Sequence, residues 1–154
     1  MKYNSILVTL KEDSGSEPVT LAEAKGHLYI TGTDHDTYLT FLIKACRQDI
    51  EGIYNISLVS KTVTAKIKNQ LGNQDLLYPP IAGINSLVTL EGEEIAFDET
   101  NYLLDTCFDD GIIEYETEAV VNEAYKFRVL ELIAYKFANR GDAAKPVNKG
   151  VWLV

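Results

Sequence analysis

Hydrophobic residues recur with helical spacing in three stretches of the chain. Thr20 and Glu23 stand at the start of the first stretch with the spacing of a capping box. The three apolar stripes are Leu21, Ala24 and Leu28; Leu39, Leu42, Ile43, Cys46, Ile50 and Ile53; and Tyr125, Val129, Leu132, Ile133 and Phe137. Steps of three and four residues predict amphipathic helices. We therefore expect a helical pair within residues 18–55 and a last helix within residues 119–141.

Between the helices, the apolar pattern changes to alternation. Residues 59–67 alternate apolar with polar side chains, which predicts a half-buried strand. Residues 1–17 also begin like a strand. Further short strands are expected at residues 86–90, 95–97, 102–104 and 112–115, with turns at residues 91–94 and 109–111. Because the connections between these strands are short, we expect antiparallel pairing.

The predicted fold class is α+β and mainly helical. Two N-terminal helices and one C-terminal helix are expected to pack around a central segment of short antiparallel strands, residues 56–116. The length of 154 residues fits one domain. We therefore expect a single domain over residues 1–154, with residues 142–154 as a tail.

Net charge narrows the range of partners. The chain carries 14 Lys and Arg residues against 23 Asp and Glu residues, a formal charge of −9. Binding of duplex DNA through its phosphates requires clustered cations, so this balance disfavours a DNA-binding protein. No apolar run approaches the roughly 18 residues of a membrane span. We expect no membrane association.

Few residues offer catalytic or metal-binding chemistry. Residues Asp34–Asp36 and Asp109–Gly111 each resemble part of a metal site. Helix capping explains the first better, and a turn explains the second better. Nucleotide-binding, nucleophile-elbow and zinc-protease motifs do not occur. We therefore predict that the protein is not an enzyme and uses no cofactor, metal or small-molecule substrate.

Acidic residues are concentrated between Glu91 and Glu118, a segment with eleven carboxylates and no Lys or Arg. The candidates for an acidic surface, or for the lining of a channel, are Glu91, Glu93, Glu94, Asp98, Glu99, Asp109 and Asp110. An ordinary solvated face explains such a run. A surface that meets a basic partner, or that repels a passing phosphate backbone, is the second interpretation. Catalysis by a carboxylate pair is the third.

Basic residues form two smaller groups, one on the strand at residues 59–67 and one on the last helix. They could pair with the acidic segment of a neighbouring copy, or with acids of the same chain. Trp152, in an apolar terminal segment, could contact another subunit or its own domain. The candidate interface residues are Arg47, Glu51, Lys61, Lys66, Lys126, Arg128, Arg140 and Trp152.

An ordered set of short motifs resembles the head–tail connector, or head-completion, proteins of tailed bacteriophages and prophages. No single motif is strong, and their order and spacing over residues 18–141 carry the resemblance. The motifs are Pro18–Leu28; Asp34 and Asp36; Leu42–Arg47 with Ile50 and Glu51; Leu77–Ile81 with Ile84–Leu87; Asn101–Asp105; and Phe137–Arg140. The chain departs from the family at residues 115–123, where an aromatic-glycine strand and a proline are frequent.

The resemblance implies a ring of identical subunits below the portal protein. Such a ring extends the DNA channel and docks the next connector or tail protein, and DNA passes through it without sequence-specific binding. It further implies a location at the virion head–tail interface, after assembly in the cytoplasm of the host bacterium. The alternative hypothesis is a monomeric acidic module that binds a basic protein.

Overall fold

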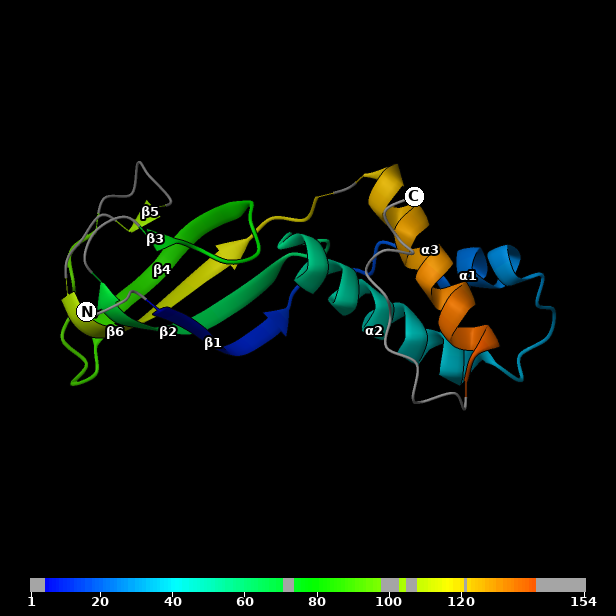
Figure 1. The fold of residues 1–154 in the computed structure, drawn as a ribbon, viewed down its shortest axis with the longest axis horizontal. Coiled ribbons are helices and arrows are strands. Elements are labelled where there is room, and N and C mark those ends of the chain that lie inside the picture. The colour runs from blue at the N-terminus through cyan, green and yellow to red at the C-terminus, as the bar shows by residue number, and fades with distance from the viewer. Residues whose placement is uncertain (1–4, 71–73, 98–102, 105–107, 121, 141–154) are drawn as a thin grey trace. The chain divides into compact units, whose positions relative to one another are not determined.

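The computed structural model describes residues 5–70, 74–97, 103–104, 108–120 and 122–140 (Figure 1). In chain order the elements are β1 (Ser5–Asp13), α1 (Leu21–Leu28), α2 (Asp36–Tyr54), β2 (Lys61–Gln70), β3 (Gln74–Asp75), β4 (Ile81–Thr89), β5 (Leu103–Leu104), β6 (Phe108–Thr117) and α3 (Glu123–Ala138). The chain forms two compact units. Residues 1–16 and 54–120 form a strand unit, and residues 17–53 and 121–154 form a helical unit. The single domain over residues 1–154 stays a prediction.

The strand unit is built on a four-stranded sheet with the order β1-β2-β6-β4. All three pairings are antiparallel, as predicted. Alternate residues of the strands share one face, where Val63 lies opposite Tyr115 and Ala65 lies opposite Ile113. These side chains are fully buried and form a cluster with Leu76, Ile81 and Leu87. We call this the core face and call the opposite face of the sheet its outer face.

A β-bulge interrupts strand β1 between Val8 and Leu10. Thr9 is the extra residue, and its hydroxyl donates a hydrogen bond to the carbonyl of Thr64 at 3.1 Å. An inserted residue shifts the side-chain alternation by one position. Leu7 therefore lies opposite Lys66 and Leu10 lies opposite Thr64, so that both leucines stand on the outer face.

Three features of the predicted fold are wrong, and one of them is the strand expected at residues 95–97, which form no strand in the structure. Helices and strands hold nearly equal shares of the described residues, so the fold is α+β but not mainly helical. Asp109–Gly111 forms no turn, because these residues belong to the ten-residue strand β6. Strand β6 pairs with β2 on one side and β4 on the other. In this segment, Asp110 and Gly111 pair with β2, and Gly111 also pairs with Thr89 of β4. This strand pairing outweighs the local turn preference of Asp and Gly.

Gly111 is required by the packing of the Phe108 ring. A Cβ atom at position 111 would lie 2.8 Å from Phe108 Cε2 and 3.1 Å from the Val88 carbonyl oxygen. We expect Gly111→Ala to lower the free energy of unfolding by about 1–3 kcal/mol through overpacking. Urea unfolding measures this loss. Gly83→Ala is the matched control, since its Cβ would meet nothing within 4 Å. Equal losses in the two variants would contradict the steric explanation.

The helical unit begins as the sequence predicts. Thr20 caps α1, and the capping box with Glu23 is complete. Asn122 caps α3, where its side-chain oxygen accepts a hydrogen bond from the Ala124 amide at 2.7 Å. The predicted stripes supply the buried apolar residues of the three helices, namely Ala24 on α1; Leu39, Leu42, Ile43, Cys46 and Ile50 on α2; and Val129, Leu132 and Ile133 on α3. None of the described helices is long and apolar enough to cross a membrane.

Candidate functional site

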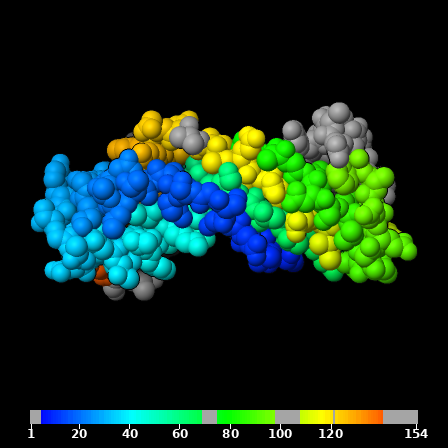
Figure 2. All heavy atoms as spheres, turned by 180° about the vertical axis from the view of Figure 1, so that it is seen from behind, coloured from blue at the N-terminus to red at the C-terminus, as the bar shows by residue number. Residues whose placement is uncertain are grey.

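Three exposed carboxylates stand on a tight turn that follows β4. Glu91, Glu93 and Glu94 are all exposed. The amide of Gly92 donates to the Thr89 carbonyl at 3.1 Å, and the amide of Thr89 donates to the Glu93 carbonyl at 2.8 Å. Gly92 has a φ of 89°, in the left-handed region that glycine favours. We call residues 90–94 the acidic hairpin; Figure 2 shows this part of the chain, in lime green, at the surface.

The other predicted acidic residues are placed differently. Asp109 and Asp110 lie on β6, where Asp109 is exposed and Asp110 is half-buried opposite Lys68 of β2. Asp98 and Glu99 lie outside the described residues. The predicted acidic surface therefore divides into a projecting hairpin and a strand of the sheet.

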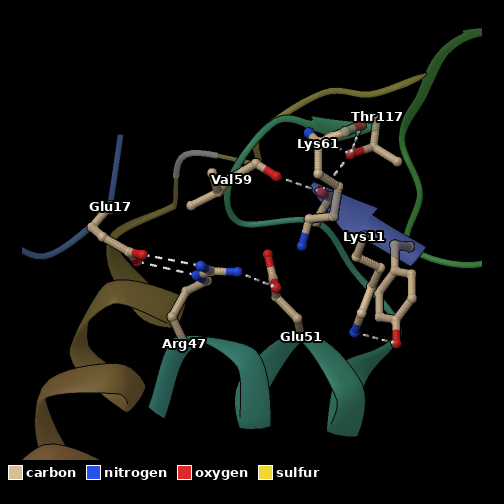
Figure 3. A network of polar contacts seen from close by, with 9 residues as sticks. Lys11, Glu17, Arg47, Glu51, Val59, Lys61 and Thr117 are labelled. Carbon is tan, nitrogen blue, oxygen red and sulfur yellow. Dashed lines mark hydrogen bonds and ion pairs between the residues drawn. The ribbon is translucent and has the colours of Figure 1, made fainter. Parts of the chain in front are cut away.

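A buried ionic cluster joins α2 to the segment that precedes α1. Arg47 donates to both carboxylate oxygens of Glu17, from Nε at 3.1 Å and from Nη2 at 3.0 Å. Its Nη1 donates to Glu51 Oε2 at 2.9 Å, one helical turn along α2. Figure 3 shows the Arg47 side chain between these two glutamates. The Arg47 and Glu51 side chains are 1% and 2% exposed, so their charge-assisted hydrogen bond is held out of water, whereas Glu17 is 32% exposed.

Three residues predicted for a subunit interface are instead buried within the chain. They are Arg47, Glu51 and Lys61. Lys61 lies on the core side of β2, its Nζ is 5.4 Å from the centre of the Tyr78 ring, and its amide donates to the Thr117 hydroxyl (Figure 3). The charged Arg47 side chain is buried because Glu17 and Glu51 pair with it. Burial gives these side chains contacts within the chain.

The basic residues of α3 and of the turn that follows it have partners within the helical unit. Lys126 forms an ion pair with Glu23 of α1 at 2.5 Å, and the Arg140 guanidinium lies 4.7 Å from the centre of the Phe137 ring. Arg128 is half-buried. Trp152 lies outside the described residues. Lys66 is the one predicted basic interface residue that lies on the outer face of the described sheet, in the same unit as the acidic hairpin.

The Asp34–Asp36 segment has no metal-site geometry. Helix α2 begins at Asp36, whose carboxylate pairs with Lys25 at 2.8 Å. The His35 ring instead packs edge-on against Phe137, with ring centres 5.3 Å apart. Among the described residues, no group of three His, Cys, Asp or Glu side chains could hold a metal ion.

Sequence reasoning missed the exposed leucines of β1. Leu7 is 64% exposed and Leu10 is 51% exposed. In an unbroken strand, residues three apart stand on opposite faces, and the bulge at Thr9 places them together. The pattern of apolar residues in β1 carries no signal for this bulge.

The ionisation of Glu23 makes the stability of the helical unit depend on pH. Hydrogen bonds from Lys126 and then Thr20 lower the pKa of Glu23 from its usual 4.5 to about 2. Because the folded-state pKa is depressed, the stabilisation is present above about pH 4.5 and is lost as the pH falls towards 2. The side chain is 38% exposed, so solvent screening reduces the effect to about 1 kcal/mol or less.

We therefore expect Glu23→Gln to lower the free energy of unfolding at pH 7 and to have little effect at pH 2. Urea unfolding of both proteins at pH 7, 4, 3 and 2 measures this difference. A difference that stays constant over the whole range would contradict the role of the Glu23 charge.

Comparison with protein families identifies the family of this chain. The model of the phage gp6-like head-tail connector protein family matches residues 18–149. The chain belongs to this family. The predicted resemblance is confirmed, and the head–tail connector is a structural protein of virion assembly rather than a class of enzyme. A comparison with curated proteins gives no match.

Two solved structures share the connector's fold. A chain in the structure described as "Virion of native gene transfer agent (GTA) particle" is 17% identical, with a TM-score of 0.62 over 90% of this chain and 89% of that one. A chain in "Neck of empty GTA particle computed with C6 symmetry" is 19% identical, with a TM-score of 0.62 over 92% and 90%. At these identities the likeness shows the fold alone.

Proposed function

We propose that this connector is the subunit of a closed ring of identical copies at the junction of head and tail. The family match over residues 18–149 carries the proposal. The similarity in fold to a chain from a neck structure computed with C6 symmetry supports it, because rotational symmetry is typical of rings. In this proposal, the ring forms below the portal protein and docks the next connector or tail protein.

We further propose that the ring extends the channel through which DNA passes. The net charge of −9 disfavours attachment to a phosphate backbone. A channel wall that repels phosphates lets DNA pass without sequence-specific binding. Assembly in the cytoplasm of the host bacterium, before incorporation at the virion head–tail interface, belongs to the same proposal.

Removal of the chain during particle assembly tests the connector role. Without it, we expect heads and tails to accumulate unjoined, because the surface that links them is missing. Electron microscopy of the particles counts joined and unjoined forms, and supplying the wild-type chain from a second copy should restore joined particles. Normal numbers of complete particles in its absence would contradict the proposed function.

A further inference from the structure

Strand β1 presents an open apolar edge in the strand unit. It is the first strand in the sheet order β1-β2-β6-β4, so only β2 pairs with it in the described chain. Leu7 and Leu10 are 64% and 51% exposed on the outer face of this edge, which is visible in dark blue in Figure 2. An exposed edge strand with apolar side chains is a template for association with another chain.

Basic side chains border these leucines. Lys66 lies opposite Leu7, and Lys68 lies opposite Ser5, both on the outer face of β2. On the β6 side, Lys66 faces Ile112, and Lys68 faces the half-buried Asp110. Among the described residues, neither lysine takes part in an ion pair. We call Leu7, Leu10, Lys66 and Lys68 the β1 patch; it combines an apolar centre with positive charge.

The acidic hairpin has the complementary chemistry at the opposite edge of the same sheet. It follows β4, the last strand in the order β1-β2-β6-β4. Leu90 is 46% exposed at its start, and the exposed Glu91, Glu93 and Glu94 follow. The hydrogen bonds of Thr89 and Gly92 fix this turn before any partner binds. A preformed projection with an apolar residue and three carboxylates matches a patch of leucines and lysines.

We infer that the acidic hairpin of one copy docks on the β1 patch of the next copy. The inference rests on the proposed ring and names the surfaces that join its subunits. Each copy offers the hairpin at one edge of its sheet and the patch at the other. Such a head-to-tail contact is heterologous, and repetition by rotation closes it into a ring. Leu90 lies against Leu7 and Leu10, and the glutamates face Lys66 and Lys68.

A charge exchange between two variants tests this contact. One variant carries Lys66→Glu and Lys68→Glu, and the other carries Glu93→Lys and Glu94→Lys. Each variant alone places like charges at every contact, so we expect its self-association to fall at least about tenfold. In an equal mixture, the unchanged hairpin of the first meets the unchanged patch of the second, and the two reversed surfaces also match. Native mass spectrometry should therefore find oligomers of mixed composition.

A matched control reverses two carboxylates elsewhere on the sheet. Glu114 and Glu116 lie on the outer face of β6 and accept hydrogen bonds from Asn85. The double variant Glu114→Lys and Glu116→Lys should associate like the wild type. Circular dichroism verifies that every variant is folded.

The outcomes separate this inference from the proposed ring. If both charge variants form oligomers as well as the wild type does, the hairpin contact is overturned and the proposed ring is not. Variants that fail alone and also fail to combine in the mixture would overturn the contact as well. A wild-type chain that forms no oligomer, alone or with portal protein, would overturn both proposals.

Discussion

The Arg47→Met variant is expected to lose about 3–5 kcal/mol of its free energy of unfolding. Removal of one member of a buried ionic cluster leaves charge out of water without the cation that stabilised it. Arg47 makes two hydrogen bonds to Glu17 and one to Glu51, and the Glu51 side chain is 2% exposed. The loss therefore combines broken contacts with the desolvation of carboxylates.

Urea unfolding at pH 7 measures the Arg47 effect. Gln48→Met is the matched control, because it places the same side chain at the next, exposed position of α2. This control should stay within about 0.5 kcal/mol of the wild type. A loss below about 1 kcal/mol for Arg47→Met would show that the cluster adds little to stability. A chain that unfolds entirely agrees with the expected size of the loss.

Tyr115→Ala is expected to destabilise the strand unit by about 3–5 kcal/mol. The Tyr115 side chain is fully buried in the core face of the sheet, and its truncation leaves a large cavity. Its hydroxyl donates a hydrogen bond to the Leu77 carbonyl at 2.9 Å. Burial also raises the pKa of this phenol, so the hydroxyl stays protonated as a donor throughout the physiological range.

Tyr115→Phe separates the packing of the ring from its hydrogen bond. This variant keeps the ring and should lose only about 1 kcal/mol. Denaturant unfolding of the two variants side by side compares their losses in the free energy of unfolding. Equal losses in the phenylalanine and alanine variants would assign the stability to the hydrogen bond rather than to the packing of the ring.

Local rules predicted the helices well, because the information that defines them lies within a few residues. The apolar stripe of α2 supplies its buried apolar residues, and Thr20 caps α1 as expected. The prediction of a turn at Asp109–Gly111 was wrong for the opposite reason. The local preference of this segment is for a turn, whereas the strand is stabilised by pairing with β2 and β4, which lie far away in sequence.

The candidate site residues also divide into those predicted by a local pattern and those that depend on contacts distant in sequence. The acidic hairpin was predicted from the short motif Glu91–Glu94, which contains its own glycine. The role of Arg47 depends on Glu17, a contact across 30 residues that no local pattern contains. The β1 patch depends on a bulge and on the β1–β2 register, so its two leucines and two lysines gather only when the sheet forms. Burial of Lys61 is likewise a property of the sheet.

The mass of the assembled protein tests most directly the claim that identical copies form a closed ring. Light scattering of the wild-type chain over a concentration series, alone and with portal protein, should detect one closed oligomer of fixed subunit number. Negative-stain images of that species should show rings with a central hole. A chain that stays monomeric at every concentration, and that also stays monomeric when portal protein is present, would contradict the account.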